Sequence, residues 1–328
     1  MGWFVRSALP RRLLTGVAIL WGTATVTFLA MRVVPGDPVD MVIGGEAVLP
    51  ETVERIRADL GLDRPLPAQY ADYLLAMARG DLGTSYQQRR PVTELLTANL
   101  GPTAQLAALA AALTVLLALA LALSTAGRRG PSRALVSALE LGTVAMPSFF
   151  IGLVLLYVFS FQLGWFPVTA KSGLVGLTLP AVTLALGSVG VMAQLMRDGL
   201  EEALRQPFAL TARARGLSRG AVTVAHALRH AFGPVLTMSG TLVGGLVGGA
   251  VLVENVFGRA GLGRVTLQAV TTRDMPMVMG VVMLSAVAFT AISIAVDALH
   301  RLVDPRLRTR RAAPAPVATE TVLAGGVA

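Results

Sequence analysis

Residues 103–123 read TAQLAALAAALTVLLALALAL, an almost wholly apolar run without a charged side chain. A helix needs about 20 mainly apolar residues to cross a bilayer, so this run predicts a transmembrane helix. Five further stretches meet the same condition, and the full set is 13–31, 103–123, 134–162, 178–196, 232–253 and 278–300. The sequence therefore predicts an all-α polytopic membrane protein with six transmembrane helices.

The composition of the 328-residue chain agrees with this fold class. Hydrophobic residues make up 54% and charged residues only 14%, whereas soluble chains are about 25% charged. There is no cysteine, which excludes disulfides, thiolate catalysis and Cys-based zinc sites. In a membrane protein, a net charge of +9 indicates orientation and contact with anionic lipid rather than with nucleic acid. We therefore expect membrane lipid as a partner and no nucleic acid.

Basic residues are unevenly divided between the loops. With the N-terminus inside, the inner segments carry 17 of the 28 Lys and Arg residues but only five of the 19 acidic residues. The positive-inside rule then makes both termini cytoplasmic. Residues 1–12 become a cytoplasmic N-terminus, and the first span is an uncleaved anchor rather than a signal peptide. Residues 309–328 have no apolar period and are predicted to form a disordered cytoplasmic tail.

The sequence contains no recognisable catalytic constellation. It has no P-loop, no G-x-S-x-G and no H-E-x-x-H motif. His226 and His230 are four residues apart, but no carboxylate beside them completes a metal site. Glu140 and Asp297 lie near the cytoplasmic ends of predicted spans, where we expect them to reach the interface or pair with a loop arginine rather than take part in transport. We therefore expect a conduit without cofactor, metal or enzymatic activity.

The longest outer segment, 32–101, is predicted to form a small helical cap. Proline and glycine divide it into three short helices. Pro50 opens the first and Gly61 ends it, Pro67 opens the second and Gly80 ends it, and the third runs from Pro91 to about Leu100. Because the third is amphipathic, we expect it to lie along the membrane surface before the second span. A second outer loop, 254–274, is glycine-rich, but without a preceding strand it is no dinucleotide site.

The longest cytoplasmic loop, 197–231, predicts a compact helix–turn–helix. A helix breaks near Pro207, a short helix begins at Phe208, Gly216 ends it, and Ser218 caps the next helix. We expect one face to be small and its edges to be basic; the small residues are Ala212, Ala214 and Gly216, and the basic ones Arg213, Arg215 and Arg219. Such a segment suits docking into a groove of another protein or binding to anionic headgroups, and its residues leave both open.

Gly240, Gly244 and Gly248 form a stripe in the fifth predicted span. Small residues at spacing four let helix backbones approach closely in lipid. The stripe fits either packing within this chain or an interface with a partner subunit.

Eleven short motifs occur in order along the chain. They are 34–38 (VPGDP), 60–67 (LGLDRPLP), 80–83 (GDLG), 146–149 (MPSF), 179–184 (LPAVTL), 211–217 (TARARGL), 226–229 (HALR), 248–254 (GGAVLVE), 261–263 (GLG), 273–274 (RD) and 304–306 (DPR). With them, residues 3–308 resemble the membrane-spanning permease subunit of ATP-binding-cassette (ABC) importers for dipeptides and oligopeptides. Of the two permease subunits, the chain is similar to the one with the larger outer loop.

The resemblance implies a role for the cytoplasmic loop 197–231. In such importers this loop is the coupling segment, which sits in a groove of the ATPase subunit. The implied coupling residues are Phe208, Thr211, Ala212, Arg213, Ala214, Arg215, Gly216 and His226. Leu210 stands where the widest importer consensus has Glu, and Arg229 where it has Pro; both departures are usual in the peptide subgroup. Within that subgroup Phe208 replaces a common Tyr, Arg215 a Lys, and His230 an Asn.

The resemblance also implies partners and a location. The permease domain would be 13–308, in the plasma membrane of a prokaryote. It would pair with a homologous second permease subunit, two P-loop ATPase subunits that bind the ATP, and an extracytoplasmic substrate-binding protein. The family handles dipeptides, longer peptides, glutathione, nickel complexes and some sugars, so the sequence does not select the substrate. The alternative is a stand-alone secondary transporter or channel, but the paired repeats and buried mid-membrane charges common there are absent from the sequence.

Overall fold

The computed structural model describes residues 3–33, 36–43, 48–169 and 173–303. The regular secondary structure of these residues is helical, apart from one isolated extended pairing between Thr84 and Pro91. The helices are α1 (Trp3–Val33), α2 (Pro38–Ile43), α3 (Pro50–Asp59), α4 (Leu66–Ala78), α5 (Val92–Thr125), α6 (Pro131–Ala145), α7 (Ser148–Leu155), η1 (Leu156–Gln162), α8 (Leu174–Arg205), α9 (Pro207–Ala214), α10 (Arg219–Val222), η2 (Thr223–Ala227), α11 (Leu228–Val256), α12 (Leu262–Thr271) and α13 (Met275–Val303). The elements η1 and η2 are π-helical. The all-α prediction is confirmed.

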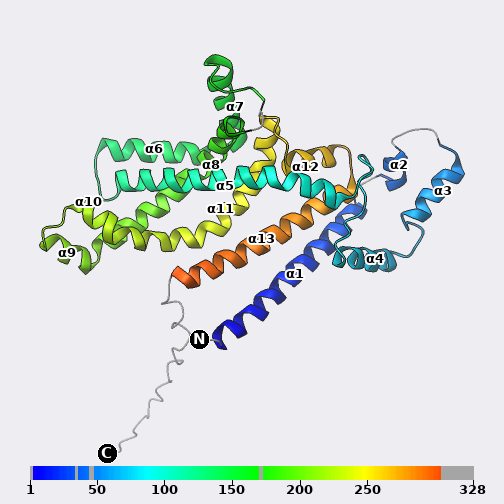
Figure 1. Cartoon of the computed structure of the whole chain (residues 1–328), viewed down its shortest axis with the longest axis horizontal. Coiled ribbons are helices and arrows are strands. Elements are labelled where there is room, and N and C mark those ends of the chain that lie inside the picture. The colour runs from blue at the N-terminus through cyan, green and yellow to red at the C-terminus, as the bar shows by residue number, and fades with distance from the viewer. Residues whose placement is uncertain (1–2, 34–35, 44–47, 170–172, 304–328) are drawn as a thin grey trace, which may run out of the picture.

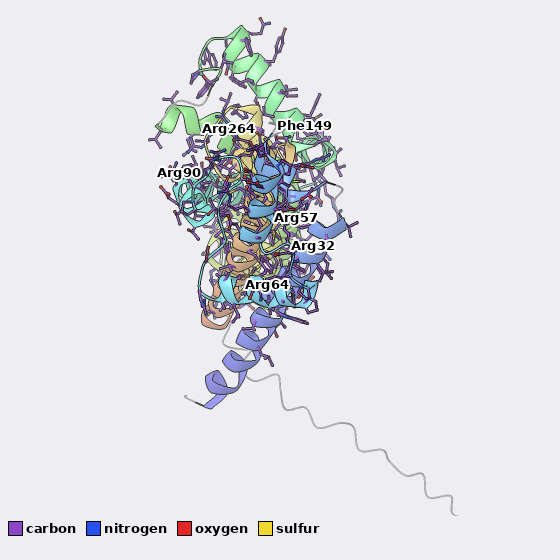
Figure 2. All side chains as sticks on the ribbon, turned by 90° about the vertical axis from the view of Figure 1, so that its right-hand side faces the viewer. Arg32, Arg57, Arg64, Arg90, Phe149 and Arg264 are labelled. Carbon is purple, nitrogen blue, oxygen red and sulfur yellow. The ribbon has the colours of Figure 1, made fainter. Side chains whose placement is uncertain are left out.

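The molecule is elongated, with different short helices at its two ends. Helices α2, α3 and α4 lie at one end, and α9 and α10 lie at the other (Figure 1). Long helices connect the ends, and α8 is central because it contacts α5, α6, α7 and α11. Helix α1 runs beside α13 (Figure 1). We call the end with α2–α4 the cap end; Figure 2 views it directly and labels Arg32, Arg57 and Arg64 there.

Among the described residues, the long apolar helices coincide with the predicted spans. Four are long and apolar enough to cross a membrane, namely Leu14–Val33, Val92–Thr125, Leu174–Arg205 and Met275–Val296. A fifth is added if Pro131–Ala145 and Ser148–Gln162 count as one bent span. The fifth predicted stretch, 232–253, falls in α11, where Leu242–Val256 is a shorter apolar helix. These helices identify a membrane-embedded protein.

The third predicted span, 134–162, is wrong as a single straight helix. Its two halves, α6 and α7–η1, are bent by 108° relative to each other. The break lies at Met146, whose backbone is extended (φ −93°, ψ 129°). The cause is Pro147, because proline disfavours helical geometry in the residue before it and has no N–H to donate.

The prediction of a separate surface helix from Pro91 to Leu100 is also wrong. Helix α5 runs without a break from Val92 to Thr125 and contains Pro102. Its 34 residues span about 51 Å, against about 30 Å for a hydrocarbon core. The amphipathic face, which includes Val92 and Leu96, is buried in a cluster with residues of α12 and α13. These contacts replace the expected contact with lipid. The other two predicted cap helices are confirmed as α3 and α4.

Two buried carboxylates tie segments that are distant in the sequence. Glu254 accepts hydrogen bonds from the Thr103 hydroxyl (2.6 Å) and from the Gly263 backbone N–H (2.7 Å), joining α11 to α5 and α12. Asp274 accepts hydrogen bonds from the Ser85 hydroxyl and the Tyr86 N–H, joining the loop after α4 to the start of α13. The second outer loop, noted in the sequence for its glycines, contains the ten-residue helix α12.

Some predicted features lie outside the described residues. They are the tail at 309–328 and the DPR motif at 304–306. The side chains of Asp297 and His230, and those of residues 1–12, also lie outside the described set.

Candidate functional site

The predicted helix–turn–helix is present at the end of the molecule opposite the cap (Figure 1). Pro207 occupies the first turn of α9, and Arg215 follows its last residue. Gly216 makes the turn with φ +88°, a left-handed conformation that side-chain-bearing residues rarely adopt. Ser218 then caps α10 by accepting a hydrogen bond from the Ala221 N–H. The sequence signals for this segment therefore act as predicted.

One side of α9 is turned inward. Ala209 and Ala212 are buried together with Val222, and Phe208 and Leu204 pack against them. The prediction that Ala212 and Ala214 share one small outer face is therefore wrong. Residues two apart lie about 200° apart around a helix, which places them on opposite sides. Ala212 and Phe208 thus hold α9 against the end of α8.

The other side of α9 and the turn that follows are exposed. This exposed set, which we call the knob surface, consists of Leu210, Thr211, Arg213, Ala214, Arg215, Gly216 and Leu217. Leu210 is 63% exposed and Leu217 is 41% exposed. Exposed leucines beside arginines suit contact with a protein groove, in which both apolar and charged groups find partners. The sequence reasoning did not assign the two leucines to the site, and helical spacing could not have joined them, because α9 ends at Ala214 before Leu217.

Polar contacts join α10, which follows the knob surface, to the neighbouring ends of the long helices. The Arg219 guanidinium donates to the Gly127 carbonyl in the turn between α5 and α6. The Gly127 N–H donates to the Glu201 carboxylate on α8 (3.2 Å), which also pairs with Arg133 on α6 (2.8 Å). These contacts link α10 to the turn after α5 and to α6 and α8. Arg219 was predicted as part of the basic edge of this segment, but Gly127, Glu201 and Arg133 were not predicted as part of the site.

A buried ion pair lies next to this network. Arg197 donates to both carboxylate oxygens of Glu140 (2.9 and 2.6 Å) and to the Thr125 hydroxyl (3.2 Å). The Glu140 side chain is fully buried, and that of Arg197 is 5% exposed. The expected pairing of Glu140 with an arginine is confirmed, but Arg197 lies in α8 rather than in a loop. The pair joins α6, α8 and α5 close to the knob.

His226 lies in η2, between α10 and α11. It is only partly exposed, and its buried Nδ1 atom has no hydrogen-bond partner among the described residues. It is therefore less exposed than the residues of the knob surface, and it lies on a separate helical element. Within the described residues there is also no cluster of three or more His, Asp or Glu that could bind a metal ion.

The glycine stripe of α11 faces mostly open space. A Cβ atom added at Gly240 or Gly248 would meet no described atom within 4 Å, and one at Gly244 would meet only the Phe289 ring at 3.4 Å. The close approach within this chain is instead at Gly249, where an added Cβ would lie 2.9 Å from Leu184. The stripe is therefore not used for tight packing between described parts of this chain.

Long apolar helices around α8, with an exposed and braced knob at one end, define the class as a membrane transport subunit. A family model places it more closely: the chain belongs to the binding-protein-dependent transport system inner membrane components, whose model matches residues 114–309. The model for the N-terminal part of such membrane components matches residues 5–107. The chain is thus a permease subunit of an ABC transport system and not an enzyme, as the sequence predicted.

Relatives agree over most of the chain. A putative peptide transport system permease protein of Brucella abortus (strain 2308) is 36% identical over 91% of this chain and 98% of its own length. The glutathione transport system permease protein GsiC of Pectobacterium atrosepticum is 35% identical over 91% and 97%. A chain in the solved structure of the MetNI methionine ABC transporter, in an inward-facing conformation, superposes with a TM-score of 0.53 and 18% identity. The superposition covers 64% of this chain and 96% of the MetNI chain. That last similarity concerns the fold alone.

Proposed function

We propose that this chain forms half of the translocation path of an ATP-driven importer for peptides, with a homologous second permease subunit forming the other half. The relatives named for peptide and glutathione transport support this substrate class, because glutathione is itself a short peptide. The observation that carries the coupling role is the knob surface, which is exposed on its outer side and packed and braced behind.

The membrane arrangement follows from the helices and the charges. We propose six spans, with α6, α7 and η1 together forming the third and α11 the fifth. The uneven division of basic residues favours the knob end and both termini in the cytoplasm. The cap end is then extracytoplasmic, which agrees with its position opposite the knob (Figure 1). The permease domain is 13–308, with an outer insertion at 32–101 and a coupling loop at 197–231.

The coupling mechanism follows from the contacts behind the knob. Two ATPase subunits bind ATP, and each permease inserts its knob surface into a groove on one of them. Closure of the ATPases displaces α9 and α10, and the Arg219–Gly127 and Glu201–Arg133 contacts carry that displacement to α5, α6 and α8. ATP can shift the transporter between its inward- and outward-facing states only by favouring one of them. This chain needs no cofactor of its own.

The remaining partners occupy the other surfaces. A substrate-binding protein docks on the cap, at 32–101 and 254–277, on the extracytoplasmic face of a prokaryotic cell membrane. The open glycine stripe of α11 faces the second permease subunit or the path between them, because it makes little close contact within this chain. Anionic lipid contacts the basic cytoplasmic edge.

The test of this proposal uses the left-handed turn at Gly216. The Gly216→Ile change forces a β-branched residue to φ +88°, which distorts the turn and the knob surface. The matched control is Gly220→Ile, because Gly220 is also exposed with no neighbour within 4 Å but has no positive φ. We expect ATP-driven peptide uptake into vesicles with the complete transporter to fall at least tenfold in Gly216→Ile, with normal membrane insertion, and to persist in the control. Normal uptake by Gly216→Ile would contradict the proposal.

A further inference from the structure

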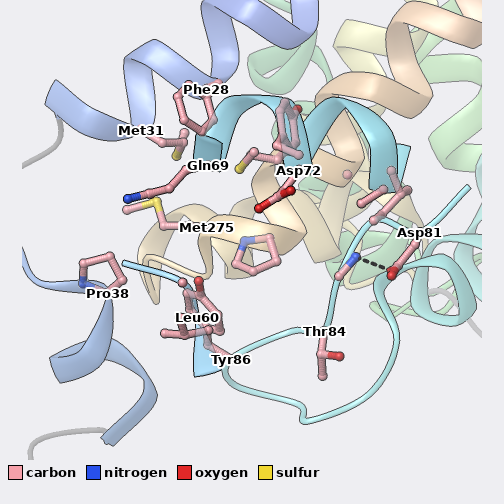
Figure 3. A pocket seen from close by; sticks show the side chains of 18 of the residues that line it. Phe28, Met31, Pro38, Leu60, Gln69, Asp72, Asp81, Thr84, Tyr86 and Met275 are labelled. Atoms are coloured by element: carbon pink, nitrogen blue, oxygen red, sulfur yellow. Dashed lines mark hydrogen bonds between the residues drawn. The ribbon is translucent and has the colours of Figure 1, made fainter. Parts of the chain in front are cut away.

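A cavity of about 740 Å³ lies at the cap end, between the end of α1, the helix α4, the loop that follows it and the start of α13. Figure 3 shows this cavity from close by. Its volume falls in the range of about 300–1,000 Å³ that is usual for small-molecule sites. It lies within this one chain, at the end of the molecule opposite the knob surface.

The walls of the cavity are apolar and adaptable. Its lining includes Phe28, Met31, Tyr73, Met77, Met275 and Met279. Methionine side chains are flexible and polarizable, so they fit apolar groups of different shapes. The rings of Phe28 and Tyr73 stack with centroids 5.6 Å apart and form a fixed wall. Such a lining accepts varied side chains instead of selecting one.

The Tyr73 hydroxyl is a polar group in this lining without a partner. It is buried and makes no hydrogen bond to any described residue. Burial raises the pKa of Tyr73 to about 12, with a smaller contribution from Tyr70, so the hydroxyl keeps its proton at neutral pH. A neutral O–H buried without a partner costs free energy. Because the oxygen is closed off from solvent, a ligand acceptor reaches it only when the Tyr73 side chain turns toward the cavity.

The lining also carries both signs of charge. The Arg32 guanidinium donates to the neutral Gln69 amide and lies 5.1 Å from the centre of the Phe28 ring, and no carboxylate of a described residue forms an ion pair with it. Gln69 and Asp72 both project from α4, three residues apart (Figure 3), so the Asp72 carboxylate lies on the same wall as the Arg32–Gln69 contact. Asp72 pairs with Arg64, and both side chains are more than half exposed, so water screens this pair and leaves the carboxylate able to exchange partners. The cavity thus offers a cation and an anion on an apolar wall.

We propose that this cavity is a binding site for the free substrate, a short peptide with both termini charged. The C-terminal carboxylate pairs with Arg32, the N-terminal ammonium with Asp72, and the peptide side chains contact the methionines. The inference rests on the proposed function for the substrate class, and it adds a place on the permease where a peptide binds after leaving the binding protein. A lipid acyl chain carries no group that could form an ion pair with Arg32 or Asp72.

The experiment measures equilibrium binding of radiolabelled alanyl-leucyl-phenylalanine to the complete transporter in lipid nanodiscs, without the binding protein. We expect Arg32→Gln and Asp72→Asn each to weaken binding at least fivefold. The control variants are Arg55→Gln and Glu51→Gln, which make the same charge changes on exposed positions of α3 outside the cavity. Both controls should bind the peptide as the wild type does.

Capped peptides test the two contacts on the unaltered protein, so the result does not depend on how the variants fold. Amidation of the C-terminus should weaken wild-type binding at least fivefold and abolish the effect of Arg32→Gln. Acetylation of the N-terminus should do the same for Asp72→Asn. Equal binding of free and capped peptides would overturn the inference, as would displacement of the peptide by phosphatidylethanolamine, which would identify a lipid site.

Uptake assays with the binding protein separate the two proposals. Peptide uptake without saturable binding to the permease would overturn the cavity site and leave the proposed function standing. Absence of both uptake and binding would overturn the proposed function and, with it, the peptide site.

Discussion

Replacement of Glu140 by glutamine should destabilise the protein far more than an ordinary surface change. The substitution removes one charge from a buried pair and leaves the Arg197 guanidinium, 5% exposed, without a counter-ion between α5, α6 and α8. Breaking a buried ion pair on one side costs about 3–5 kcal/mol, because the remaining charge stays desolvated. The double variant Glu140→Leu, Arg197→Met removes both charges and keeps an apolar volume. Its free energy of unfolding should therefore lie within about 1 kcal/mol of the wild-type value or exceed it.

The assay is reversible unfolding of the purified chain in mixed micelles with increasing SDS, followed by circular dichroism. The control is Arg129→Gln, because Arg129 is exposed and forms no described ion pair, and a change of at most about 0.5 kcal/mol is expected. A loss below about 1 kcal/mol in Glu140→Gln, or a double variant less stable than the single one, would refute the reasoning that the pair is buried and coupled.

Three further changes have definite expected outcomes. Asp274→Ala leaves the buried hydroxyl and N–H groups of residues 85–87 without their acceptor, so hydrogen exchange in that loop should quicken and stability should fall by about 1–3 kcal/mol. Gly263→Ala places a Cβ 2.4 Å from the α11 backbone, and thermal unfolding should show a loss of about 1–3 kcal/mol from overpacking. The hydrogen bond from the Val39 N–H lowers the pKa of Asp37 below its ordinary 3.8. Partial burial acts in the opposite direction, and Arg57 of α3 lowers the pKa further. The stabilising effect of ionised Asp37 is therefore present above pH 3.8 and is lost as the pH falls through the lower folded-state pKa. Melting temperatures of wild type and Asp37→Asn should thus differ at pH 6 and converge only as the pH falls below the lowered folded-state pKa, and a gap that is unchanged down to that acid range would contradict the assignment.

Local signals in the sequence were sufficient for the short helices. Pro50 opens α3, Gly216 makes the turn after α9, and Ser218 caps α10, as predicted. Each of these effects depends on the backbone of one residue and its immediate neighbours. Such positions can be assigned before any tertiary contact is known.

Tertiary contacts decide the features that the sequence reasoning missed. Helix α5 continues through Pro102, because its first turns pack on α12 and α13 instead of on lipid. The third span bends at Met146. The prediction missed this bend, although Pro147 was visible in the sequence, because it used hydropathy alone and so joined the two apolar halves. Hydropathy reports the amount of apolar sequence and not the direction of the helix that contains it.

The candidate site was likewise predicted where local signals decide it and missed where tertiary contacts decide it. Its position and turn were predicted, but the side of α9 that faces outward was not, since Ala212 is buried and Leu210 is exposed. The supporting contacts of Gly127, Glu201 and Arg133 join three separate helices, and no spacing along the chain reveals them.

The most direct test of the coupling role is photo-crosslinking from the knob surface in the complete transporter. Because the chain contains no cysteine, Ala214→Cys provides its only thiol for a benzophenone label, and Ala71→Cys provides an exposed control on α4 at the cap end. The label on Ala214→Cys should cross-link to an ATPase subunit, with a yield that changes when ATP is added, and the control should not cross-link to an ATPase subunit. Labelling of lipid alone from position 214, with no ATPase adduct in the assembled transporter, would contradict the account.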